Sequence, residues 1–479
     1  MGINRRHFLS LGAAGAATMF LPALQRGKGG RFFSNSARAA AGATGPLLIT
    51  LEAHAAWDAT FLVDPHVDAA FTPWTNADLR TVAGTSLKYA PNLLADGTKT
   101  PYVVPTSIGS TSTVDFFTKH GSKLVVVNGV DNATVSHDVG PRVAFTGSNR
   151  EGLPSLVGMF AAARGATLPL SLMTTGGFVN TEGLIPITRA GSVSVLQGLA
   201  RSNVANFTAQ PANQRKYEDD SVFSLVRDRV RQRDARRAAA ASVPRAIQGV
   251  LNVEATRTQD VFTNFDALSS AFDAASSVQS QNPVIPQAAA CMAAMSAGAC
   301  VAAHLITSES FDTHQQHDLD HPVSMQNLLE ILDFVLDRAA SDPNIAARGL
   351  MVVVGSDFGR TKYNNDDPAG KDHWPVTSMM VAAVGPAASL IQGGRVVGQT
   401  TTKVNGATAG GLISKTVKTT PDGGDLQVSG SPSDVALTAG HVHLAVRDAL
   451  GLSSDDPTAA RFRLTAVVPQ TSLPILKPR

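Results

Sequence analysis

The sequence is short of aromatic residues and of surplus charge, and each shortage excludes something. Phe, Trp and Tyr make up 6% of the 479 residues, so the core must be packed mainly with aliphatic side chains. Lys and Arg total 40 against 38 Asp and Glu, which lacks the basic surplus of a dedicated nucleic-acid binder. After the N-terminal region, no run reaches the ~18 apolar residues of a membrane span. The 43% hydrophobic content and the mean hydropathy of +0.04 are instead typical of a globular protein.

Cysteine is also scarce, since only Cys291 and Cys300 are present. In one continuous helix their spacing separates the two Cα atoms by ~13 Å, beyond the ~7 Å that a disulfide tolerates. A helix that stops at Gly298, before a strand at 301–306, would allow a bridge in an oxidising compartment. Two buried free thiols are the other interpretation. Neither the spacing nor the neighbours indicate a cysteine metal site.

Residues 1–39 have the features of a twin-arginine export signal. Arg5 and Arg6 precede an apolar run at 9–24 that is rich in Gly and Ala, and the Ala-Arg-Ala at 37–39 resembles a signal peptidase site. A buried N-terminal helix is the competing interpretation. We expect the chain to use the twin-arginine (Tat) export machinery and to be periplasmic or secreted. The signal holds six basic and no acidic residues, so the remainder has 34 basic against 38 acidic residues.

Five short apolar runs predict buried strands, at 47–51, 123–127, 301–306, 350–354 and 379–384. Continuous β-branched runs bounded by glycine and polar residues are typical of parallel strands in a sheet covered on both faces. A helix leads into the fourth run, and a second helix is expected at 441–450. The apolar stripe of the first helix consists of Leu328, Leu332, Val335 and Leu336. The alternation predicts a doubly wound α/β sheet.

Residues 205–290 are charged, rich in Ala and helical in pattern, and we interpret them as a helical insertion or cap. The core is then formed by 40–204 and 291–479. The Arg-rich run at 227–237 has interleaved aspartates, which favours a solvated helix face over a nucleic-acid patch. Its helix carries an apolar stripe of Val222, Leu225, Val226 and Val230. Residues 400–433, rich in Gly, Thr and Ser, predict a long surface loop or hairpin.

Acidic residues and histidines recur where the predicted strands end, in clusters at 52–58, 309–317, 355–360 and 371–375. In α/β sheets, ligands bind outside the carboxyl ends of the strands. Carboxylate oxygens and imidazole nitrogens together suit zinc, manganese and related divalent ions, and ligands from different strand ends can assemble a two-metal site. One aspartate after a strand is more often a helix cap, but four such clusters exceed what capping requires.

Four segments together resemble an exported bacterial family, the domain of unknown function 1501. They are the twin-arginine start, Phe311-Asp312-Thr313-His314-Gln315, Ser356-Asp357-Phe358-Gly359-Arg360 and Asp372-His373-Trp374-Pro375. That family is similar to the alkaline phosphatase and sulfatase superfamily. The resemblance implies an α/β, alkaline-phosphatase-like three-layer sandwich with a mostly parallel central sheet and a helical insertion. It also implies a bound divalent metal and hydrolysis of phosphate or sulfate esters.

The resemblance further implies which residues hold the metal. The matching residues are Asp58, Asp312, His314, Asp357, Asp372 and His373. His317 is an alternative partner of Asp312, and Phe358 occupies a position where the superfamily has a histidine. The implied cofactor is a divalent metal, with zinc as the first choice and manganese, calcium or magnesium as alternatives. Arg360 is expected to clamp the anionic group of the substrate, because a guanidinium donates two parallel hydrogen bonds to an oxyanion.

The same resemblance places the nucleophile between residues 132 and 147. In the superfamily, a Ser, Thr or modified Cys near a helix start attacks the substrate. Here Ser136 has the expected chemistry, whereas His137 has the better spacing from the Thr-Gly at 146–147. Alternatively, Ser136 is a helix cap and His137 contacts substrate or metal. The Cys-x-Pro-x-Arg of formylglycine sulfatases is absent.

Two functions therefore remain open. The first is an exported metal-dependent hydrolase of phosphate, phosphonate or sulfate esters, acting on a small-molecule or polymeric anionic ester. The second is a non-catalytic relative that binds an anionic polymer or glycan in the same pocket. Phe358 and the ambiguous nucleophile favour the second. Neither function involves nucleic acid, and no membrane span is expected in the mature protein.

Overall fold

The computed structural model describes residues 45–478, with gaps at 201–202, 207–212, 240–271, 366–367, 453–454 and 465–471 and at a few positions in 167–192 and 274–279. The export signal predicted at 1–39 lies outside the described residues.

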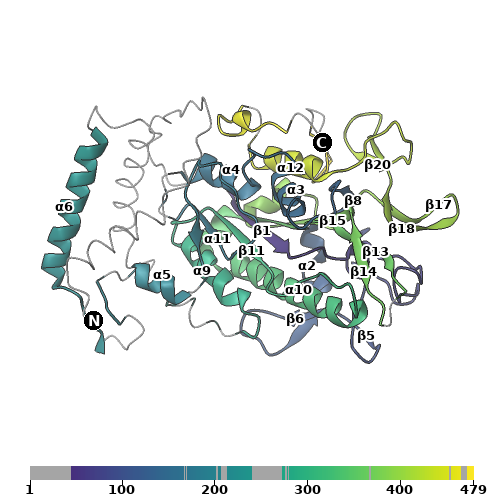
Figure 1. Cartoon of the computed structure of the whole chain (residues 1–479), viewed down its shortest axis with the longest axis horizontal. Coiled ribbons are helices and arrows are strands. Elements are labelled where there is room, and N and C mark those ends of the chain that lie inside the picture. Colours follow the sequence, from purple (N-terminus) through teal and green to yellow (C-terminus); the bar gives the residue numbers. More distant parts are fainter. Residues whose placement is uncertain are drawn as a thin grey trace.

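A mixed eight-stranded sheet forms the centre of the molecule (Figure 1). All five predicted strands are present in it. In spatial order the strands are β10 (Thr188–Arg189), β9 (Leu172–Thr174), β11 (Ala302–Ile306), β1 (Leu47–Ala53), β12 (Leu350–Ser356), β15 (Val376–Val384), β8 (Leu124–Asp131) and β16 (Arg395–Val397).

Strand direction differs from the prediction at one place. Every neighbouring pair is parallel except at β15, which runs antiparallel to both β12 and β8. A parallel return would need a crossover of a dozen or more residues, usually a helix. Between β12 and β15 the chain instead forms a hairpin of β13 (Gly359–Tyr363) and β14 (Lys371–Trp374), and it re-enters the sheet in the opposite direction. The expectation of a parallel strand at 379–384 is therefore wrong.

Helices cover both faces of the sheet, which confirms the predicted α/β class (Figure 1). One face carries α9 (Val284–Ser296) and α10 (His317–Ser341), with α2 (Phe116–His120) against α10. The other carries α3 (Gly140–Thr146), α4 (Leu156–Arg164) and α12 (Ala439–Ala449). α11 (Pro343–Arg348) links α10 to β12. The predicted stripe of α10 is buried along its whole length.

Smaller sheets surround this core. A four-stranded sheet has the order β14-β13-β18-β17, with β18 at Ala407–Ser414 and β17 at Thr400–Val404. β19 (Val417–Thr419) pairs with β20 (Leu426–Val428), so the segment predicted as a loop or hairpin is built of hairpins. Three further hairpins are β2 (Arg80–Thr81) with β3 (Lys88–Tyr89), β4 (Asn92–Leu93) with β5 (Lys99–Thr100), and β6 (Val103–Pro105) with β7 (Thr113–Asp115).

The predicted insertion contains one long described helix, α6 (Asp220–Ala239), which stands away from the sheet (Figure 1). The shorter α5 (Val193–Ala200) precedes it. The apolar stripe predicted on α6 is exposed, with Leu225 59% exposed. At the end of the predicted insertion, α9 packs against β11 and α10. Among the helices described, none is both long and apolar enough to cross a membrane.

Both cysteines are buried and free, as the second interpretation expected. Cys291 lies in α9, whereas Cys300 lies beyond its end, where Gly298 adopts a positive φ of 71°. Burial raises the pKa of Cys300 to about 12, so the thiolate is strongly disfavoured.

Candidate metal centre

Four loops and strand ends meet at one edge of the main sheet. His137 lies between β8 and α3, Asp312 and His314 lie between β11 and α10, and Asp357 directly follows β12. His373 comes from β14, next to Arg360 of β13 in the hairpin register. The carboxyl ends of three strands therefore bring these side chains together, as the sequence predicts.

Three imidazoles and one carboxylate converge. Oδ1 of Asp312 is 3.0 Å from Nε2 of His314 and 3.0 Å from Nε2 of His373, and these two nitrogens are themselves 3.0 Å apart. Nε2 of His137 is 3.5 Å from Oδ2 of Asp312. Around a tetrahedral zinc ion with bonds of about 2.0–2.1 Å, ligand atoms lie roughly 3.3 Å apart. The donor set and its spacing therefore fit a divalent cation, with His137, Asp312 and His373 close enough to share it.

Each histidine is held through its other ring nitrogen. Nδ1 of His137 is 2.5 Å from Oδ2 of Asp357, and Nδ1 of His314 is 2.9 Å from Oδ1 of Asp372. Nδ1 of His373 is 3.0 Å from the carbonyl oxygen of Val135. Because all three partners can accept a hydrogen bond, a proton on each Nδ1 would satisfy them and would leave each Nε2 lone pair for a bound cation. This backing of imidazoles by carboxylates and carbonyls is usual for metal ligands.

The electrostatics of the centre also favour a cation. Although burial favours the neutral acid, hydrogen bonds from Arg360 and His373 lower the pKa of Asp312 to about 2. The hydrogen bond with Asp357 raises the pKa of His137, because the carboxylate stabilises the imidazolium. Three ring lone pairs and a carboxylate that face one another repel unless a proton or a metal ion lies between them. The centre is thus built to hold positive charge.

Phe358 supplies a wall of this centre. Its buried ring lies 4.8 Å, centroid to centroid, from the ring of His137 and 4.6 Å from that of His373. The Phe358 side chain therefore packs against two candidate ligands and offers no donor atom.

Two glycines allow the backbone to approach the centre closely. A Cβ at Gly140, the first residue of α3, would lie 2.5 Å from Cβ of Asp357 and 2.8 Å from its carbonyl oxygen. A Cβ at Gly370, just before β14, would lie 1.7 Å from the carbonyl oxygen of His314. Both contacts are far shorter than atoms tolerate, so only glycine fits at these positions. They set how near α3 and β14 come to the centre.

Residues 62–411, more than half of the chain, match the family described as "Protein of unknown function (DUF1501)". The chain belongs to the DUF1501 family. The matched region contains every residue of the metal centre, and Asp58 lies just before it. No curated protein matches the chain.

In this DUF1501 protein, Asp58 does not join the centre, and its assignment as a metal ligand is corrected. Its buried carboxylate forms an ion pair with the buried ammonium of Lys371 and lies 3.2 Å from Nε2 of His317. Burial opposes ionisation, but the Lys371 ammonium holds the pKa of Asp58 far below its usual range. The Lys371 ammonium thus already supplies the positive charge beside Asp58. His317, the alternative partner of Asp312, is likewise engaged here.

Arg360 is not an anion clamp, because its side chain is fully buried. Its Nε donates to the carbonyl of Ala56, and its terminal nitrogens donate to the carbonyls of Ala55, Phe311 and Lys371 and to Oδ1 of Asp312. Four of these five bonds go to backbone. The guanidinium therefore ties two loops and the start of β14 together around the centre and fixes Asp312.

Four further predicted residues lie in or beside the centre. Asp357 and Asp372 lie behind His137 and His314, so they orient ligands and do not face the centre themselves. Ser136 accepts the amide of Asp138 at 3.3 Å in the turn before α3, whose N-cap is Val139 and which has no side-chain cap bond, so the alternative interpretation of Ser136 as a helix cap is not confirmed. His137 faces Asp312 and is one of the three candidate metal ligands.

Lys371 and a second histidine–carboxylate group were not predicted from the sequence. His120, Asp333 and Asp337 also lie within metal-binding distance of one another. The ammonium of Lys119 bridges the two carboxylates at 2.7 Å each, so this group already has its cation. A lysine two positions before His373 gives no sequence signal of burial, because lysine is usually exposed.

Proposed function

We propose that this chain is a metal-dependent hydrolase that holds one divalent cation, with zinc as the first choice, at His137, Asp312 and His373. The observation that supports the proposal best is the convergence of three Nε2 atoms on the Asp312 carboxylate, each imidazole being fixed by an acceptor at Nδ1. Two histidines and one carboxylate form a ligand set of catalytic zinc sites, which keep a further position open.

A divalent cation at this position would supply Lewis-acid charge for hydrolysis. His314 and Asp372 form a pair beside it, in which Asp372 fixes the ring and Nε2 faces the centre. An imidazole held in this way can accept a proton from an attacking water and return it to a leaving group. Asp357 holds His137, and Arg360 holds Asp312, so the geometry is maintained by the protein itself.

For the ester class we propose phosphate, phosphonate or sulfate esters, which the resemblance of the sequence motifs to the alkaline phosphatase and sulfatase superfamily supports. Water would be the attacking group in this proposal. In this proposal His137 is a metal ligand and so does not attack, and Ser136 forms no hydrogen bond with a candidate ligand among the residues that the structure describes.

A non-catalytic role is favoured by one observation. Nε2 of His314 is 3.0 Å from both Asp312 and His373, near enough to be a fourth ligand. A tetrahedral site with four protein ligands is closed and structural. The protein would then be a relative that retains the metal for its fold.

His314→Ala separates the two roles. In the hydrolase, the metal content measured by elemental analysis stays near that of the unaltered protein while turnover of an aryl phosphate, phosphonate or sulfate falls by about 10²-fold or more, since general acid–base catalysis contributes about that much. His373→Ala should lose both metal and turnover, and His66→Ala, outside the centre, should lose neither. Loss of metal from His314→Ala, or no turnover of any of the three esters by the fully metallated protein, supports the structural role instead.

A further inference from the structure

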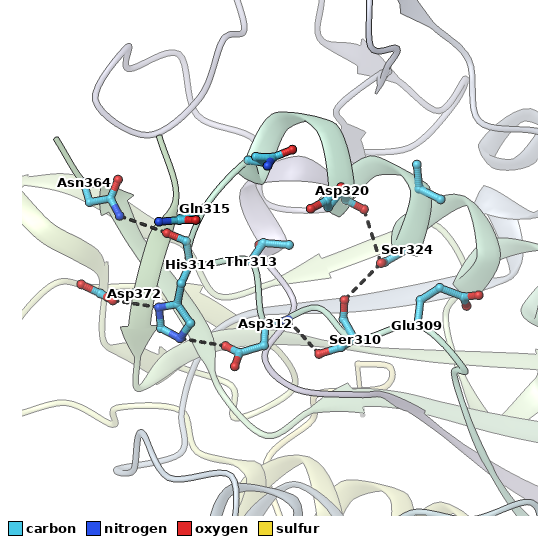
Figure 2. Close-up of a pocket in the computed structure, with 12 residues that line it drawn as sticks. Glu309, Ser310, Asp312, Thr313, His314, Gln315, Asp320, Ser324, Asn364 and Asp372 are labelled. Carbon is cyan, nitrogen blue, oxygen red and sulfur yellow. Dashed lines mark hydrogen bonds and ion pairs between the residues drawn. The ribbon is translucent and has the colours of Figure 1, made fainter. Parts of the chain in front are cut away.

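An open groove of about 840 Å³ lies beside the metal centre (Figure 2). It runs along the loop at 309–316 and the first turns of α10, and Asn364 and Asp372 close one side. Asp312 and His314 line it as well, so the groove and the metal centre share residues. A substrate bound at the centre would extend into this space.

The groove is acidic. Its lining includes Glu309, Asp312, Asp320 and Asp372, but neither Lys nor Arg. Asp312 is neutralised by Arg360, and Asp372 is engaged by His314. Glu309 and Asp320 form no ion pair with any residue that the structure describes, and Figure 2 shows them on the side of the groove away from His314. The remaining lining is almost entirely neutral and polar, with hydroxyl and amide groups.

The start of α10 does not reverse this charge. A helix N-terminus carries positive partial charge, and α10 begins at His317 beside the groove. Asp318 and Asp320 in its first turn offset that charge. An extended polyanion would meet uncompensated carboxylates here, and like charges brought together in this way disfavour a ligand.

We propose that the substrate is an ester whose alcohol carries a positive charge, such as a phosphate ester of an amino alcohol. This inference rests on the proposed hydrolase function. The phosphate end would lie at the cation of the metal centre, and the ammonium end would lie between Glu309 and Asp320. In hydrolysis, the oxygen of water forms a bond to phosphorus and the bond from phosphorus to the ester oxygen breaks. One proton of the water passes to the departing amino alcohol, leaving inorganic phosphate.

The decisive comparison uses two substrates of equal shape. Phosphocholine carries a quaternary ammonium, and 3,3-dimethylbutyl phosphate carries a neutral carbon in its place. The zinc-loaded protein should prefer phosphocholine by about tenfold in kcat/KM, the size expected for two partly exposed charge pairs. Glu309→Gln/Asp320→Asn should reduce the preference to about twofold by slowing phosphocholine alone. Glu182→Gln/Asp219→Asn, acids outside the groove, should leave the preference unchanged.

Equal kcat/KM for the two esters, or a preference that survives in the groove variant, overturns the inference even if hydrolysis itself is established. If neither ester is hydrolysed, calorimetry with choline and with 3,3-dimethylbutanol decides the matter. Tighter binding of choline, weakened about fivefold or more in the groove variant, supports a cation-binding groove while the hydrolase proposal fails. Equal binding of both alcohols overturns the inference as well.

Discussion

At the scale of single residues, we expect the bond between Asp357 and His137 to control metal affinity, although Asp357 is not one of the proposed ligands. Asp357→Asn keeps a hydrogen-bond acceptor for Nδ1 but removes the charge that makes the imidazole a stronger donor. We expect the Kd for zinc to rise by about 10–100-fold, the usual effect of losing such a partner. Competition with a chromophoric chelator measures it. Asp138→Asn, an exposed neighbour, is the control, and equal affinities in the two variants would show that Asp357 does not act through His137.

Lys371 is a second residue whose role can be tested. Its buried ammonium pairs with Asp58 and also donates to the carbonyl of Phe71 at 2.5 Å. Lys371→Met leaves the buried Asp58 carboxylate without its ammonium partner, so we expect a loss of ~3–5 kcal/mol in the free energy of unfolding. Asp58→Asn in the same chain should recover much of that loss. Urea unfolding of the single and double variants measures both, and a double variant less stable than Lys371→Met would contradict the pairing.

Sequence patterns predicted some of these residues and missed others for a physical reason. Asp312, His314 and His373 lie next to apolar runs that end at the sheet edge, so their meeting follows from the strand pattern. The fates of Asp58 and Arg360 depend on which side chains are buried with them. That depends on packing between segments hundreds of positions apart, such as Arg360 against Ala55. The spacing of nearby residues in the sequence does not indicate this long-range packing.

At the scale of elements, α12 makes stability depend on pH. His443 is buried in this helix, and burial lowers its pKa to about 3, while burial also lowers the pKa of His441 to about 4. In the unfolded chain both titrate near 6.5, so the unfolded state binds more protons between that pH and the folded values. Stability is therefore full above about pH 6.5 and falls as the pH drops toward 3–4.

His443→Asn removes one of these groups. Between pH 7 and pH 5 the metal-free protein should lose ~2 kcal/mol less free energy of unfolding in this variant than in the unaltered protein. Chemical unfolding at the two pH values gives the difference. His66→Asn serves as the contrast, since Asp64 raises the pKa of His66 against the effect of burial. An unchanged pH slope in His443→Asn would mean that His443 is not held neutral.

At the scale of elements, the apolar runs predicted the positions of five strands correctly, but they did not predict the direction of β15. β1, β8, β11, β12 and β15 all begin within three residues of their predicted runs. The direction of β15 depends on the β13–β14 hairpin, whose strands are partly polar and carry site residues. The hairpins between residues 80 and 115 have strands of two or three residues, too short to show periodicity.

At the scale of the whole molecule, a metal that joins two loops and a hairpin should stabilise the fold by linkage. At a free zinc concentration 100 times its Kd, the gain is ~2.7 kcal/mol. Exhaustive chelation should therefore lower the melting temperature, and added zinc should restore it. In His373→Ala the chelator should have little effect. An unchanged melting curve, together with no metal by elemental analysis, would exclude the centre.

Export also concerns the whole chain, and its prediction rests on the twin arginines Arg5 and Arg6. We propose that the protein leaves the cytoplasm through the Tat machinery. Replacing Arg5 and Arg6 with Lys should retain a folded precursor in the cytoplasm, detected by cell fractionation and immunoblotting. Substituting Arg26 and Arg31, basic residues after the apolar run, should not. Normal export of the Arg5/Arg6 variant would contradict the twin-arginine interpretation.

The pairing of β8 with β15 has a consequence for folding fidelity. Asp131 of β8 lies opposite Val376 of β15, so the loop with His137 and the strand with His373 leave the sheet side by side. A slip of two residues in this register would preserve the alternation of faces, but it would move His373 by roughly 6.8 Å. That exceeds any ligand distance in the centre. Metal affinity would therefore distinguish correctly registered molecules from slipped ones that a hydrophobic core alone could not reject.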